Sequence, residues 1–321
     1  MRLAQPARKS PILPSNLTPL GALPARFRRE RVLIVGCGDV GLRAARVLAA
    51  RVQRLALTSS PERRPELRAA GLIPIFGQLD EPATLRRLAG IATRVLHLAP
   101  PPAVGEADPR TRSLTRALRR RSLPQALVYG STSGVYGDCA GAWIDETRPL
   151  APRTARGQRR VAAERTLRDW GGGAGVRVSL LRIPGIYAPD REGGTPEARL
   201  RRGTPVLDAA DDVYTNHIHA DDLARACVLA LWRGRAQRAI NVNDNTVLKM
   251  GDYFDMAADL YRLPRPPRVL RALAQQTLPA LQLSFMGESR RMDNTRLQTE
   301  LRLVLRYPDV CAGLGALPIS S

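Results

Sequence analysis

The sequence predicts an α/β fold, a doubly wound parallel sheet with a smaller, mostly helical C-terminal lobe. Short apolar runs alternate with helix-like segments over residues 31–181. This alternation is typical of a parallel sheet that helices cover on both faces. After residue 184, prolines, glycines and charged residues interrupt the alternation. A second, smaller unit is therefore expected to follow the main part of the sheet.

The individual elements follow from apolar runs, prolines and glycines. Apolar runs predict strands at 32–35, 54–58, 73–76, 94–98, 126–129, 176–181 and 239–242. Segments between them predict helices up to residue 48 and at 61–70, 82–89, 108–121, 153–170 and 220–232. Gly71 is expected just after the second helix, and 171–175 is expected to be a loop. Residues 249–314 are expected to be mostly helical, with an amphipathic stretch at 269–286 packing on the lobe.

The turn after the first strand has the pattern Gly36-x-Gly38-x-x-Gly41. Gly36 permits a sharp turn, Gly38 leaves room for a pyrophosphate, and Gly41 lets the helix pack closely on the strand. Free amides and the dipole at the helix start favour the negative phosphates. We therefore predict a dinucleotide-binding loop that includes Asp39 and Val40. The alternative is an ordinary glycine-rich turn before a helix.

This motif and the break after residue 183 predict three parts of the chain. Residues 1–30 contain five prolines and several basic residues, and we interpret them as a flexible basic leader; a transit-like role is the alternative. Residues 31–183 and about 214–244 are expected to form a Rossmann-type NAD(P)-binding domain. Residues 184–213 and 245–314 are expected to form the substrate-binding lobe.

Composition argues against several classes of function. The net charge of +21 could indicate a nucleic-acid partner, but the arginines are spread along the chain and aromatic residues make up only 4%. We therefore expect no specific nucleic-acid partner. No apolar run is long enough to span a membrane. The four cysteines form no CxxC pair, which favours a reducing compartment, so a cytoplasmic protein is expected. We also expect a monomer or a homodimer.

Four motifs together resemble the extended short-chain dehydrogenase/reductase superfamily, of the NAD(P)-dependent epimerase/dehydratase type. They are VLIVGCGDVG at 32–41, VYGSTSGVYG at 128–137, LLRIPGIYAP at 180–189 and NHIHADDLARA at 216–226. The tail motif RRMDNTRLQTEL at 290–301 is most similar to an atypical subgroup. The resemblance implies an NAD(P)-dependent oxidoreductase or epimerase that acts on a small carbonyl or sugar-nucleotide substrate.

The resemblance also implies a catalytic hydroxyl at Thr132, which would hold a substrate oxygen beside the nicotinamide. The alternative is that Thr132 and its two serine neighbours only satisfy backbone groups in a turn. In this family the next helix carries Tyr-x-x-x-Lys, but here Arg156 and Arg160 stand at those positions. Arginine stays protonated and cannot remove a proton at neutral pH. The usual alcohol–ketone chemistry therefore lacks its usual base.

Two consequences follow from this departure. Arg160 can still hold a ribose hydroxyl or a phosphate, or stabilise an oxyanion. Tyr136 is the tyrosine nearest in sequence to Thr132 and could replace the base; the alternative is a packed aromatic residue. A catalytically impaired NAD(P)-binding sensor is therefore the rival to the enzyme hypothesis.

The end of the second strand bears on which nicotinamide cofactor is bound. It carries Thr58 and two serines, followed by Arg63 and Arg64, with no acid at the strand end itself. Hydroxyls and arginines suit a 2′-phosphate, so NADP is predicted; Glu62 keeps NAD possible. The resemblance also implies an adenine contact at Asp80. It further implies that the cofactor cleft is lined by Leu98, Ala99, Pro100, Pro184, Gly185 and Ile186.

No metal site is predicted. His217 and His219 lie two residues apart in an expected strand and could converge on an ion. The alternative, which we favour, is that the segment re-enters the sheet domain and that Asp221 or Asp222 caps the following helix.

Overall fold

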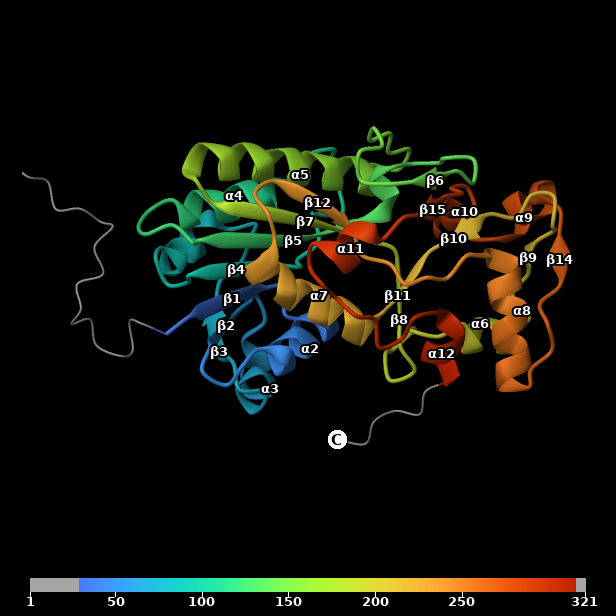
Figure 1. Ribbon diagram of the computed structural model, residues 1–321, viewed down its shortest axis with the longest axis horizontal. Coiled ribbons are helices and arrows are strands. Elements are labelled where there is room, and N and C mark those ends of the chain that lie inside the picture. Colours follow the sequence, from blue (N-terminus) through green and yellow to red (C-terminus); the bar gives the residue numbers. More distant parts are fainter. Residues whose placement is uncertain (1–28, 316–321) are drawn as a thin grey trace, which may run out of the picture.

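A seven-stranded parallel sheet forms the centre of the computed structural model, which describes residues 29–315 (Figure 1). Its strand order is β12-β7-β5-β4-β1-β2-β3, and every pairing is parallel. The predicted α/β fold is confirmed. The chain order reverses between β1 and β4, where doubly wound sheets bind ligands. The strands are β1 (Arg31–Val35), β2 (Gln53–Thr58), β3 (Ile73–Phe76), β4 (Arg94–His97), β5 (Ala126–Thr132), β7 (Arg177–Ile183) and β12 (Arg238–Asn241).

Helices cover both faces of this sheet. One face packs against α2, α3 and α7, and the other against α4, α5 and the 3-10 helix η2. These helices are α2 (Asp39–Val47), α3 (Arg64–Ala69), η2 (Pro82–Leu88), α4 (Pro109–Leu118), α5 (Ala155–Ala174) and α7 (Ala220–Arg233). In the described part of the chain, none of the helices has both the length and the apolar character needed to cross a bilayer. Most of the predicted leader, residues 1–28, lies outside the described residues.

The structure corrects three predicted helices. The expected helix 61–70 is split into η1 (Pro61–Arg63) and α3, because Pro65 has no N–H to continue the hydrogen-bond pattern. The expected helix 82–89 is the 3-10 helix η2, where the Thr84 hydroxyl bonds to nearby carbonyls. The helix α5 continues through most of the expected loop 171–175 and ends at Ala174, with Gly175 as a left-handed cap. A side chain at Gly171 would lie 2.6 Å from Val178, so glycine lets the helix pack on β7.

The C-terminal lobe has its own hydrophobic core and lies at the right of Figure 1. Residues 249–314 form several helices separated by short strands, and α11 packs on the sheet domain through Leu297. The remaining helices are η3 (Ser133–Val135), which follows β5 directly, and α6 (Glu197–Arg201), α8 (Met250–Tyr261), α9 (Arg271–Thr277), α10 (Ala280–Phe285), α11 (Thr295–Thr299) and α12 (Val310–Gly315). Short strands pair as β6 (Trp143–Ile144) with β15 (Arg291–Met292), β8 (Gly185–Tyr187) with β11 (His217–His219), β9 (Val206–Leu207) with β14 (Arg268–Val269), and β10 (Tyr214–Thr215) with β13 (Leu248–Lys249).

A buried ion pair fixes α5 against the sheet. The Arg182 guanidinium on β7 lies 3.0 Å from the Glu164 carboxylate on α5, and both side chains are almost fully buried. The other Glu164 oxygen accepts a hydrogen bond from Ser131 on β5 at 2.6 Å. Arg182 also donates to the hydroxyl of Tyr136 at 2.9 Å. The helix is thus held to two neighbouring strands at their carboxyl ends.

Replacing Glu164 should reveal how much this pair contributes. Glu164→Gln keeps the size of the side chain but leaves the buried Arg182 charge without its carboxylate partner. We expect the free energy of unfolding to fall by about 3–5 kcal/mol, the usual cost of breaking a buried pair. The matched control is Glu197→Gln in the exposed pair with Arg201, which should cost about 0.5 kcal/mol or less. Urea titrations that find equal losses would contradict this account.

Candidate functional site

The glycine loop has the geometry that its sequence predicts. Gly36 has φ +83°, and a Cβ there would lie 2.4 Å from the backbone nitrogen of Ala99 after β4. A Cβ at Gly41 would already lie 3.3 Å from Ile34, so the helix packs tightly on β1. A Cβ at Gly38 would meet no described atom within 4 Å. The space beside Gly38 is therefore open on the side where a phosphate could approach.

A cavity of about 330 Å³ lies at this loop. It is bounded by the start of α2 and the carboxyl ends of neighbouring strands, and no side chain caps the first turn of α2. The amides of that turn therefore have no helical partner and can bind an anion. Ten predicted residues line the cavity: Gly36, Gly38, Asp39, Val40, Gly41, Leu98, Thr132, Arg160, Pro184 and Ile186. We refer to it as the glycine-loop cavity.

Arginines neutralise the one carboxylate at this loop. Asp39 lies 2.8 Å from Arg43 and also pairs with Arg191, which itself lines the cavity. Arg43 is buried and also contacts Asp190 at 2.7 Å and Asp221 at 2.5 Å. The cavity is therefore not negatively charged, and its residues fit a pyrophosphate. Arg43 and Arg191 were missed from the sequence because their partners are up to 178 residues away.

The residues predicted to contact the adenosine half do not line the glycine-loop cavity. Thr58 ends β2, and its hydroxyl bonds to Ser60 at 3.2 Å. Arg63 donates two hydrogen bonds of 3.0 Å to Glu66. Asp80 lies 2.7 Å from Arg110, which also donates to the Pro100 carbonyl. Ala99 and Pro100, predicted to line the cofactor cleft, do not line this cavity either, and the contacts of Thr58, Arg63, Asp80, Ala99 and Pro100 with a cofactor stay predictions.

A second cavity, of about 480 Å³, lies between the sheet and the lobe. It shares four lining residues with the glycine-loop cavity: Thr132, Pro184, Ile186 and Arg191. Gly185 also lines it, and the lobe contributes aromatic rings. We refer to it as the lobe cavity. A molecule in it would therefore lie against the same residues as a molecule in the glycine-loop cavity.

Thr132 is the last residue of β5 and is half-buried between the two cavities. Its oxygen accepts a hydrogen bond from the Gly134 amide at 3.3 Å, so it does satisfy a backbone group in the turn. The hydroxyl proton can still donate to a ligand. The two interpretations of Thr132 from the sequence are thus compatible in one geometry.

Arg156 and Arg160, both on α5, line different cavities. Arg160 lines the glycine-loop cavity and donates to the Gly130 carbonyl at 2.6 Å and to the Tyr129 hydroxyl at 3.0 Å. Arg156, one turn earlier, lines the lobe cavity with its guanidinium 5.0 Å from the Phe285 ring. Burial and the charge of Arg160 lower the pKa of Arg156 from its ordinary value. No carboxylate of the described chain forms an ion pair with either arginine.

The structure does not bring Tyr136 to the site. It is buried, lines neither cavity, and donates a hydrogen bond of 2.6 Å to Asn241. Burial raises the pKa of Tyr136 to about 12, whereas a general base needs a pKa nearer neutrality. The alternative of a packed aromatic residue fits this geometry.

The histidine segment also differs from expectation. His219, not Asp221 or Asp222, caps α7: its Nδ1 accepts from the backbone N–H of Asp221 at 3.2 Å. The geometry at β11 provides this acceptor one residue before the helix. His217 lines the lobe cavity and contacts the Thr215 hydroxyl at 2.9 Å. Within residues 29–315, no group of three or more His, Cys, Asp or Glu side chains could hold a metal ion.

Comparisons with known proteins agree with this geometry. A model of the NAD dependent epimerase/dehydratase family matches residues 32–243. A UDP-glucose 4-epimerase from Azospirillum brasilense is 31% identical over 126 residues, which cover 33% of this chain and only 36% of that protein.

Two solved structures resemble the chain over most of its length. A functionally unknown conserved protein from Silicibacter pomeroyi is 28% identical, with a TM-score of 0.74 over 89% of this chain and 97% of the other. The second structure is a variant of UDP-glucuronic acid 4-epimerase from Bacillus cereus in complex with UDP-4-deoxy-4-fluoro-glucuronic acid and NAD. It is 17% identical, with a TM-score of 0.71 over 89% of this chain and 97% of the other. At that identity the likeness is one of fold alone.

Two glycine substitutions should separate folding from binding. Gly36→Ala adds a methyl group against Ala99 at a positive φ, so we expect a loss of about 1–3 kcal/mol in the free energy of unfolding. Gly38→Val projects into open space, so its unfolding should change by about 1 kcal/mol or less. If Gly38→Val proved as destabilising as Gly36→Ala in thermal and urea unfolding, the open space at Gly38 would be excluded.

Burial of His217 should make the protein sensitive to acid. Burial lowers the pKa of His217 from 6.5 to about 4, so the folded state stays neutral while the unfolded state takes up a proton below pH 6.5. Stability should therefore fall from about pH 6.5 toward pH 4, by about 1.4 kcal/mol per pH unit from this group. His217→Gln should lose about 2 kcal/mol less than the wild type between pH 7 and pH 5. Parallel curves for both proteins would show that His217 does not contribute.

Proposed function

The chain belongs to the NAD-dependent epimerase/dehydratase family, and from this premise we propose that it binds a nicotinamide dinucleotide in the glycine-loop cavity. We propose further that it acts on a small carbonyl or sugar-nucleotide substrate in the lobe cavity. The observation that carries this proposal is the shared lining of the two cavities at Thr132. The Bacillus cereus neighbour, whose structure contains NAD and a sugar nucleotide, supports it.

The residues present fit such a cofactor. Gly38 leaves room for a pyrophosphate, and the first turn of α2 offers amides to it. Arg160 faces the same cavity and can bind a ribose hydroxyl or phosphate. When bound, a nicotinamide supplies hydride transfer. The Thr132 hydroxyl would donate a hydrogen bond to the substrate oxygen, and the Arg156 guanidinium would stabilise negative charge that develops in the lobe cavity.

The choice between NADP and NAD depends on Arg63. We propose that the cofactor is NADP, and NAD is the alternative. Arg63 is bound to Glu66 in the described structure, so a 2′-phosphate would have to compete for it. An exposed pair three residues apart is worth only about 0.2–0.5 kcal/mol, so this competition is inexpensive. Arg63→Ala should weaken NADP binding and leave NAD binding unchanged.

The lining of the lobe cavity favours an anionic substrate with a ring. Arg156 and Arg199 both line it, and neither forms an ion pair in the described chain. Two Arg199 nitrogens are buried without hydrogen-bond partners, and its guanidinium lies 4.3 Å from the Phe254 ring. Tyr214 and Tyr253 add further flat surfaces. Arginines suit phosphate or carboxylate groups, and aromatic faces suit sugar or base rings.

A second candidate function is an NAD(P)-binding sensor with impaired catalysis. The observation that favours it is chemical: Arg156 cannot accept a proton, and Tyr136 is buried with a pKa near 12. Losing general acid–base help costs about two to four decades in rate. Calorimetric binding of NAD or NADP without any turnover of a panel of sugar nucleotides and carbonyl compounds would favour the sensor.

The sharpest test combines cofactor binding with substitution at Arg156. Arg156→Ala should weaken sugar-nucleotide binding about tenfold or more, since a hydrogen bond to a charged group contributes about 1.5–3 kcal/mol. NAD(P) affinity should stay the same, because Arg156 does not line the glycine-loop cavity. Conversely, Gly38→Val should abolish NAD(P) binding. Unchanged calorimetric affinity for both cofactors in Gly38→Val would overturn the assignment of the glycine loop.

A further inference from the structure

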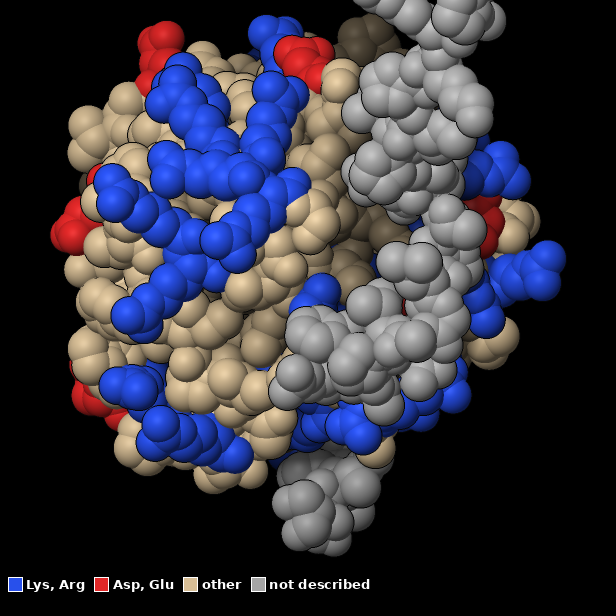
Figure 2. Space-filling model, turned by 90° about the vertical axis from the view of Figure 1, so that its left-hand side faces the viewer, with Lys and Arg blue, Asp and Glu red and all other residues tan. Residues whose placement is uncertain are grey.

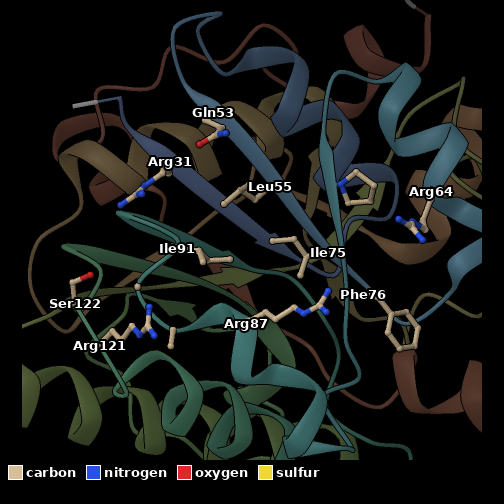
Figure 3. Close-up of a pocket in the computed structure, with 13 residues that line it drawn as sticks. Arg31, Gln53, Leu55, Arg64, Ile75, Phe76, Arg87, Ile91, Arg121 and Ser122 are labelled. Carbon is tan, nitrogen blue, oxygen red and sulfur yellow. The ribbon is translucent and has the colours of Figure 1, made fainter. Parts of the chain in front are cut away.

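A third cavity, of about 690 Å³, runs along the face of β1, β2 and β3, from the amino ends of β1 and β2 to Phe76 at the carboxyl end of β3 (Figure 3). Arg31 and Gln53 are the first residues of these strands and line its rim. Leu55 and Ile75 form an apolar floor between the labelled arginines, and Ile91 lies beside them. Apart from Arg64, one of the two arginines that suit a 2′-phosphate, its lining residues take no part in the proposed function.

The cavity exists because one connection of the sheet is short. Between β3 and β4 the chain forms only the 3-10 helix η2, which places Leu85 and Leu88 on the sheet. On the same face, α5 packs on β5 and β7, and α4 packs against α5 and η2. The sheet face near Ile75 and Ile91 is left partly uncovered, and both side chains are only half-buried. The rim residue Phe76 is 40% exposed.

Among the described residues, no acidic side chain lines this cavity, but four arginines do: Arg31, Arg64, Arg87 and Arg121. Over residues 29–315, none of the four side chains forms a hydrogen bond or an ion pair, and the Nε atom of Arg31 is buried without a partner. Neighbouring arginines behave differently, since Arg63 pairs with Glu66 and Arg94 with Glu30. These four positive charges repel one another, and no carboxylate of the described residues pairs with them to offset that repulsion.

The surrounding surface has the same sign of charge. Figure 2 shows the left-hand side of the molecule in Figure 1, where the amino end of β1 lies, and basic side chains far outnumber acidic ones on that face. An anion approaching the cavity would therefore be attracted before it makes contact.

We propose that this third cavity is a binding site for a small ligand that carries two or more adjacent phosphates and an apolar ring, such as a nucleoside polyphosphate. The arginine forks would bind the phosphates, and the ring would lie on the apolar floor beside Phe76. The volume falls in the range of small-molecule pockets, roughly 300–1,000 Å³. An extended nucleic acid would use the basic surface but not the hollow apolar floor.

The test measures ATP and inorganic tripolyphosphate binding to the full chain by calorimetry. All titrations use Gly38→Val protein, so that the glycine loop does not contribute. Arg87→Ala/Arg121→Ala removes two exposed lining arginines and should weaken both probes about tenfold or more. The control Arg86→Ala/Arg120→Ala removes two exposed neighbours that do not line the cavity, with the same change in charge. It should weaken binding by about twofold or less.

A third variant tests the apolar part of the site. Phe76→Ala should weaken ATP binding but leave tripolyphosphate binding unchanged. Equal weakening by both arginine pairs would reduce the effect to diffuse surface charge and overturn the proposal. Failure of either probe to bind at low salt would do the same. So would a single-stranded oligonucleotide that displaces ATP and binds both arginine variants equally.

Discussion

The buried ion pair between Glu164 and Arg182 holds the helix α5 against the sheet beside the two candidate cavities. It joins α5 to β7, and the second oxygen of Glu164 joins α5 to β5 through Ser131. Arg160 lies one turn before Glu164 and Arg156 one turn before that, so fixing Glu164 also fixes which cavity each arginine lines. An isolated buried charge would be costly, and the pair is tolerated because several hydrogen bonds surround it.

Charge compensation distinguishes the buried Arg43 from two arginines of the lobe cavity. Arg43 is buried with three carboxylates around it, which is a structural arrangement. Arg156 and Arg199 in the lobe cavity have no carboxylate partner within the described residues. Such groups keep their attraction for an external anion, because no internal salt bridge has to be broken first. The same reasoning applies to the four arginines that line the third cavity.

Much of the fold could be predicted from local sequence patterns. The helix end and the helix cap that were predicted wrongly each have an identifiable structural cause. The strands and their parallel order follow from short apolar runs alternating with helices. The helix α5 was predicted to end at Trp170, because three glycines in a row normally end a helix. These glycines do not end α5. The helix passes so close to Val178 that only a glycine fits at position Gly171. The predicted cap of α7 is also wrong. The backbone at β11 places the His219 side chain where it accepts the capping hydrogen bond.

By itself, the sequence determined the α/β class, the glycine turn, and the presence of Arg156 and Arg160 on one helix. These depend on periodicity and on residues close together along the chain. Only the tertiary structure decided that the two arginines line different cavities, that Arg191 pairs with Asp39, and that Tyr136 is buried in a hydrogen-bond network. The physical reason is that each of these facts depends on contacts between segments far apart in the chain, whose geometry is set by packing.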